Sequence, residues 1–98
     1  MSKPKWLTCP AELGDRAGRY WNQYAARLHA EQELTRNNLA KFAALCRLLA
    51  IIDAASAEID ANGVVVVAKS GAVKPNPAVA VILNAQRQAA PLLQRFCL

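Results

Sequence analysis

A long helical pattern runs from Thr35 to about Ala61 and limits the folds that this chain of 98 residues can adopt. Thr35 is a good N-cap residue, and Leu34 and Leu39 have the spacing of a hydrophobic staple across it. The pattern stops at Asn62-Gly63, because a glycine just past a helix can take the positive φ that ends it. We therefore predict one long helix through the middle of the chain.

One side of this helix carries residues at alternating spacings of three and four. The set comprises Phe42, Leu45, Leu49, Ile52, Ser56 and Ile59. A period of about 3.5 residues is typical of helices that pack in a coiled-coil manner. Asp53 lies among these positions, where a buried carboxylate would need a partner, such as an arginine of another helix or subunit. The alternative is that the helix twists enough for Asp53 to reach solvent.

An amphipathic helix is predicted before it, from Asp15 as the N-cap to about Ala30. Its apolar side gathers Leu13, Ala17, Tyr20, Trp21, Tyr24 and Leu28. A neighbouring side carries Arg16, Arg19, Gln23 and Arg27. Because only Glu31–Leu34 links the two helices, we expect them to pack antiparallel.

A short β-hairpin is predicted after the long helix. Val64–Val67 and Ala72-Val73 read as its strands, with a turn near Ser70-Gly71. An isolated hairpin is marginally stable in water, and four consecutive valines cannot all face one small core. We therefore expect the hairpin to pack against another subunit.

A third helix follows the hairpin. Asn76 is its expected N-cap, and Pro77 stands in the first turn, where its missing N–H costs nothing. Pro91 lies inside the pattern and is expected to kink or end the helix near Ala90.

The predicted fold class is thus mainly α: an antiparallel helical hairpin, a short β-hairpin and a third helix. Residues 1–14, broken by Pro4 and Pro10, are expected to form an extended arm before a single helical domain at 15–98. Twenty residues are alanine and only six are aromatic, so the core is light for a chain of this size. We therefore expect the domain to be oligomeric.

The net charge of +5 is concentrated in the first half of the chain. Up to Arg47 there are eight Lys and Arg against four Asp and Glu, and beyond it four against three. Such a basic half suggests an anionic partner, with nucleic acid first. The alternative is a soluble surface with ordinary excess lysine and arginine.

Several classes of function are not indicated by the sequence. Three cysteines without C-x-x-C spacing and the single His29 do not suggest a disulfide framework or a metal site. No phosphate-binding loop or acid–base pair is present, so we predict no enzyme and no cofactor. The longest apolar run is far shorter than a membrane span, and the N-terminus lacks a signal-peptide pattern, so we expect a cytoplasmic protein without membrane contact.

The order of motifs nevertheless resembles a known family. The pieces are Pro10-x-x-Leu13-x-x-x-Ala17-x-x-x-Trp21, Leu34-Thr35, Ala44-x-Cys46, Asn62-Gly63 before the valines, and Lys74-Pro75-Asn76-Pro77-Ala78. This order is similar to that of the small subunit of tailed-phage terminases, in the branch with an Asn-Pro after a hairpin. The chain departs from the family pattern at two places. Asn38 stands where the family usually has an acid. The family's Leu-Thr-Pro-x-x-Arg tail would begin where this chain stops, which indicates a truncated chain or a shortened member.

The resemblance implies a ring-forming, non-enzymatic DNA-packaging component in the host cell cytoplasm. It would bind double-stranded viral DNA at the packaging start site and regulate the terminase large subunit, which carries the ATPase and nuclease. Two alternatives remain open: a helical oligomerisation module with another partner, and a small DNA-binding regulator.

Candidate site residues follow from charge and from apolar pattern. The DNA-binding candidates are Lys3, Lys5, Arg16, Arg19, Arg27, Arg36 and Lys41. The candidates for contact between subunits are Phe42, Leu49, Val65, Val67 and Ile82.

Overall fold

Three helices and a two-stranded antiparallel hairpin make up residues 4–98, the part of the chain that the computed structural model describes. The helices are α1 (Gly14–Ala30), α2 (Leu39–Asn62) and α3 (Pro77–Arg95), and the strands are β1 (Val65–Val67) and β2 (Val73–Pro75). Short 3₁₀ turns occupy Lys5–Leu7, Ala11–Leu13 and Arg36–Asn38. The predicted mainly α class, with a hairpin between the second and third helices, is confirmed.

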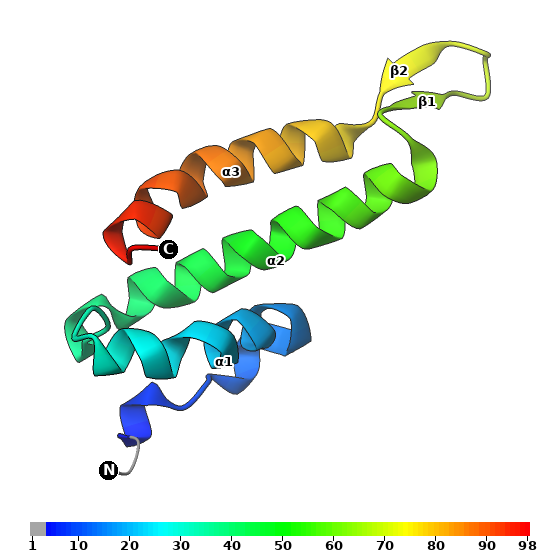
Figure 1. The fold of residues 1–98 in the computed structure, drawn as a ribbon. Helices are drawn as coiled ribbons and strands as arrows, with labels where there is room; N and C mark the ends of the chain where they lie inside the picture. Colours follow the sequence, from blue (N-terminus) through cyan, green and yellow to red (C-terminus); the bar gives the residue numbers. More distant parts are fainter. Residues whose placement is uncertain (1–3) are drawn as a thin grey trace.

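The central helix α2 lies between α1 and α3, and each neighbour runs antiparallel to it (Figure 1). The antiparallel packing of α1 on α2 is as predicted. α1 covers only the first half of α2, whereas α3 follows it from the hairpin back to the C-terminus. The hairpin projects beyond the helices, and the molecule extends over 60 × 24 × 17 Å.

The core gathers at the end of the molecule that α1 covers. Trp21 of α1, Phe42 of α2 and Phe96 just after α3 are fully buried. The Trp21 and Phe42 ring centroids are 4.9 Å apart, and those of Phe42 and Phe96 are 5.6 Å apart. The indole Nε1 of Trp21 donates a hydrogen bond of 2.9 Å to the Leu7 carbonyl. Buried aromatic rings therefore join all three helices and the N-terminal segment.

The N-terminal segment differs from the expected extended arm. Its described residues form two 3₁₀ turns, and Leu7 is buried against the core. The reason is the hydrogen bond to Trp21, which holds the segment on α1. Asp15 is exposed and provides no cap: α1 begins at Gly14, whose φ is +79°, with no capping hydrogen bond from a side chain.

Local signals place the end of α2 correctly, whereas Thr35 begins the 3₁₀ turn Arg36–Asn38 and α2 itself begins three residues later than predicted, at Leu39. Before it, the side chain of Asn38 accepts a hydrogen bond of 2.8 Å from the Thr35 N–H and donates one of 2.8 Å to the Glu33 carbonyl. The predicted cap at Thr35 is thus completed by Asn38, whose amide both accepts and donates, as a carboxylate could not. At the other end, Gly63 takes a φ of +83° directly after the helix.

Asn76 fixes the base of the hairpin. Its Oδ1 accepts from the Ala78 N–H at 3.0 Å, which is the predicted N-cap of α3. Its Nδ2 donates to the Gly63 carbonyl, and its backbone N–H donates to the Val64 carbonyl, both at 2.8 Å. This buried side chain therefore ties the end of α2, the hairpin and the start of α3 together.

Pro91 does not end α3, which continues to Arg95. Of the two expected outcomes, a kink or an end near Ala90, the end is wrong. Pro91 faces solvent, which can hydrate the carbonyl that loses its partner, and the burial of Phe96 stabilises the last turn.

Candidate nucleic-acid and subunit interfaces

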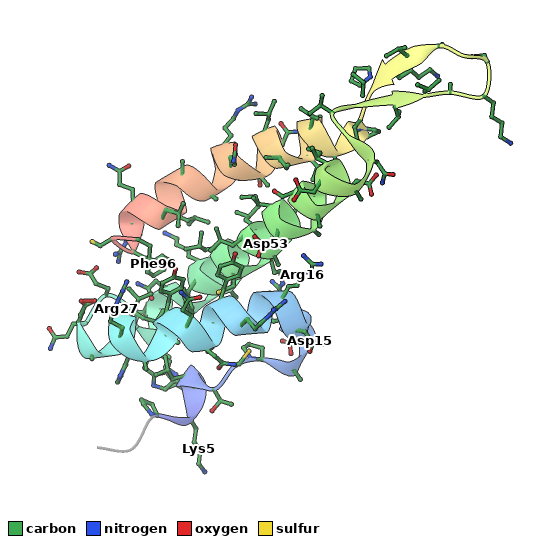
Figure 2. All side chains as sticks on the ribbon, turned by 45° about the vertical axis from the view of Figure 1, so that its right-hand side comes forward. Lys5, Asp15, Arg16, Arg27, Asp53 and Phe96 are labelled. Atoms are coloured by element: carbon green, nitrogen blue, oxygen red, sulfur yellow. The ribbon has the colours of Figure 1, made fainter. Side chains whose placement is uncertain are left out.

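The basic side of α1 is exposed along its whole length. Ala17, Trp21 and Leu28 face the core and so turn the opposite side of the helix, with its arginines, toward solvent. Arg16 and Arg27 lie at opposite ends of α1, and Lys5 points away from the body of the molecule (Figure 2). The predicted stripe is thus present as a solvent-facing surface.

The arginines of this stripe differ in their partners. Arg27 Nε lies 3.5 Å from Glu31 Oε1, and its guanidinium carbon lies 5.5 Å from the centroid of the Tyr24 ring. Arg16 and Arg19 have no ion-pair partner among residues 4–98. The two unpaired guanidinium groups are therefore the more available ones for an anion.

The remaining basic candidates lie outside α1. Arg36 belongs to the 3₁₀ turn before α2, and Lys41 to the first turn of α2; both are exposed. Because the link from α1 to α2 is short, they lie near the C-terminal end of α1. Lys3 lies outside the described residues.

The carboxylate of Asp53 is bound by a tyrosine. The hydroxyl of Tyr20 donates a hydrogen bond of 2.6 Å to Asp53 Oδ2, joining α1 to α2. This hydrogen bond, with burial as the smaller cause, raises the pKa of Tyr20 to about 12. Asp53 reaches solvent, which was the alternative considered, and its partner is not an arginine.

The candidates for subunit contact fall into three groups. Val65 and Val67 on β1 are 51% and 71% exposed, whereas Leu49 and Ile82 are half-buried. Phe42 is fully buried between Trp21 and Phe96, so its side chain is not available to a second copy in this structure.

The strand register adds Val73 and Pro75 to the apolar face of Val65 and Val67, the two valines already predicted to contact another subunit. Val65 pairs with Pro75, and Val67 pairs with Val73, which is 67% exposed. Directly opposed residues of an antiparallel pair point to the same face. The hairpin plate, defined here as Val65, Val67, Val73 and Pro75, is therefore apolar and open to solvent. The alternation of apolar and charged residues along β2, Val73-Lys74-Pro75, would have indicated this face if the pairing of the two strands had been known.

A comparison with protein families identifies the chain. The family model described as phage terminase, small subunit, matches residues 17–98, which include nearly all of α1 and everything after it. The chain belongs to this family. The resemblance inferred from the motif order is thereby confirmed, and a role in phage DNA packaging follows in general terms. No curated protein and no solved structure matches the chain.

The terminase small subunit shows no cluster of three or more His, Cys, Asp or Glu side chains fit to hold a metal, as far as residues 4–98 are concerned. Cys46 is buried between the helices, and this burial raises the pKa of its thiol to about 12. A thiol that stays protonated is a poor nucleophile. No helix among the described residues is long and apolar enough to cross a bilayer.

Proposed function

We propose that this terminase small subunit is a non-enzymatic packaging component that acts in the host cytoplasm. It assembles into a ring, binds double-stranded viral DNA at the packaging start site and regulates the large subunit. The family match over residues 17–98 carries the proposal. Terminase small subunits are generally not catalytic, in keeping with the sequence analysis.

The shape of the chain supports assembly. Its radius of gyration is 16.7 Å, whereas a compact domain of this length has one of about 13 Å. The excess comes from the end that carries the hairpin, where α2 and α3 pack only on each other (Figure 1). An extended helix pair with an apolar hairpin face favours burial against further copies.

The charge distribution supports DNA binding through phosphates. Arg16 and Arg19 lie on the exposed side of α1 without an ion pair to any residue in 4–98, and the chain carries a net charge of +5. In a ring this surface would repeat around the circumference, so weak contacts would add by avidity. Phosphate contacts position a protein without reading sequence, and their affinity falls by roughly 0.9 log units per log unit of salt for each phosphate neutralised.

The test of the proposed DNA surface is the double variant Arg16→Ala with Arg19→Ala. Fluorescence anisotropy with a duplex containing the packaging start site should show weaker binding and a shallower salt dependence than for the wild type. Arg87→Ala, an exposed arginine on α3, is the control and should leave both unchanged. Light scattering should show the same oligomer for all three proteins.

The outcomes separate the proposed function from its alternatives. Unchanged DNA binding by the double variant would move the surface to Arg36, Lys41 and Arg47. An oligomer that binds no DNA under any salt condition would favour an oligomerisation module, and a stable dimer would favour a small regulator. Stimulation of the large subunit's ATPase by wild-type rings tests the regulatory role.

A further inference from the structure

The β-hairpin receives little support from the rest of its own chain. It projects beyond the helices, and the hydrogen bonds from Asn76 to Val64 and Gly63 hold only its base (Figure 1). A two-stranded hairpin standing alone is marginally stable in water. Because the sheet has only two strands, each strand also has an outer edge with no neighbouring strand.

The strand register determines which backbone groups point toward these outer edges. The Asn76 N–H donates to the Val64 carbonyl, and the Ala68 N–H donates to the Ala72 carbonyl, both at 2.8 Å. Hydrogen-bonded and non-hydrogen-bonded pairs alternate along an antiparallel ladder. The two pairs of the hairpin plate lie one and three steps along the ladder from the first of these bonds, so they are non-hydrogen-bonded pairs. Their backbone N–H and C=O groups therefore point away from the opposite strand.

The outer edges of β1 and β2 offer different groups. On β1, Val65 and Val67 each present an N–H and a C=O, and no proline or charged side chain interrupts the strand. On β2, Val73 presents both groups, but Pro75 presents only its C=O because proline has no N–H. None of the three outward N–H groups donates to a residue that the structure describes. Since proteins commonly use prolines and charges to prevent edge pairing, the β1 edge is open to a further strand.

We propose that β1 of one copy pairs antiparallel with β2 of the next copy, an inference that rests on the proposed ring. In the register that the hairpin itself uses, Val67 and Val73 of the next copy exchange two hydrogen bonds. The Val65 N–H then donates to the Pro75 carbonyl of the next copy. Pairing two β1 strands would instead make a two-fold contact and leave both β2 edges bare, whereas pairing unlike edges closes a ring with no bare edge.

The same pairing suits the side chains of the hairpin. Opposed residues of antiparallel strands point to the same face, so the hairpin plates of neighbouring copies join into one apolar face. On the other face, Lys74 of each copy lies beside Val66 of a neighbouring copy and not opposite another lysine. Edge pairing therefore combines backbone hydrogen bonds with contacts between apolar side chains, and it opposes no like charges.

Substitution by proline tests the β1 edge. Val67→Pro removes an N–H that the chain itself does not use, so the concentration needed for assembly should rise about tenfold or more. Val67→Thr keeps the N–H and the branched side chain, and it is the matched control that should assemble like the wild type. Val73→Pro and Val73→Thr make the same comparison on β2. Light scattering measures assembly, and circular dichroism checks that the helices are folded.

Amide hydrogen exchange tests the pairing in the wild-type protein, without any substitution. In rings, the Val67 and Val73 amides should be protected at least about tenfold more than the Ser70 amide, each relative to its intrinsic exchange rate. The Ser70 amide is the internal control, because it lies in the turn between the strands and no item of the ladder covers it. Mass spectrometry with fragmentation to single amides provides this measurement.

Each result supports or overturns the pairing. If Val67→Pro assembles as readily as Val67→Thr, or if the Val67 and Val73 amides are protected no better than Ser70, the edges do not pair. Protection of Val67 without Val73 would show that two β1 strands pair, and protection that appears only with the large subunit would assign the edge to that partner. Rings with freely exchanging edge amides would leave the proposed function standing, which fails separately if the wild type forms no ring or binds no DNA.

Discussion

The two ends of the molecule are held together by different means. At the end that α1 covers, the rings of Trp21 in α1, Phe42 in α2 and Phe96 just after α3 pack together. Toward the hairpin, the buried apolar side chains of α2 and α3 are Ala55 and Ala85, which let the helices approach but bury little area. Stability and assembly can therefore be altered separately, because the end that α1 covers supplies the core and the hairpin end exposes the apolar residues.

The largest effect is expected at the core end. Phe42→Ala removes a ring that contacts both Trp21 and Phe96, so it should lower the free energy of unfolding by about 3–5 kcal/mol. Urea denaturation followed by circular dichroism measures this loss. Val64→Ala, at an exposed position outside the hairpin plate, is the control and should change stability by less than about 0.5 kcal/mol. Equal effects of the two substitutions would remove the distinction between the ends.

At the hairpin we expect a large effect on assembly and a small effect on stability. Val65→Lys with Val67→Lys puts charge into the hairpin plate, so the concentration needed for assembly should rise about tenfold or more while the helices stay folded. Light scattering measures assembly, and circular dichroism measures helix content. The matched change Val66→Lys, on the other face of the hairpin, should have a smaller effect on assembly. If all three valines respond alike, the plate is not the contact surface.

The base of the hairpin gives a smaller effect. Asn76→Asp keeps the oxygen that caps α3 but loses the donor to the Gly63 carbonyl, at a cost of about 1 kcal/mol or more. Asn76→Ala loses the cap as well and should cost more. Assembly should fall with both variants, because the hairpin loses its fixed direction. Thermal unfolding and light scattering together check this order.

Sequence alone predicts the features that depend on nearby residues. Asn62-Gly63, the valine run and Asn76-Pro77 each determine a turn or cap within a few residues, and the structure has them there. Sequence could not decide whether the apolar side of a helix is covered by the same chain or by another subunit. The apolar spacing around Phe42 suits a neighbouring subunit as well as the chain's own α3, and the chain itself fills this space.

The errors in the prediction have the same origin. The rule that proline ends a helix is local, and burial of Phe96 outweighs it at Pro91. The partner of Asp53 lies 33 residues away, and only the packing of α1 on α2 brings Tyr20 to it. The solvent-facing arginines were predictable because amphipathic spacing alone turns them outward, whereas their partners depend on where each acid lies.

The smallest effect concerns Tyr20, at the border between the two ends. Tyr20→Phe removes the hydrogen bond to Asp53 and should cost about 1 kcal/mol at neutral pH. The pKa of Tyr20 is about 12 in the folded protein, against an ordinary value of 10.0, so the folded state holds the phenolic proton more tightly. The stability from this bond is therefore complete below pH 10 and is lost as the pH rises toward 12. Denaturation curves of wild type and Tyr20→Phe should converge over that interval, whereas Tyr24→Phe should match the wild type throughout. A difference that persists at pH 12 would mean that Tyr20 stabilises the helix pair by packing and not through its hydroxyl.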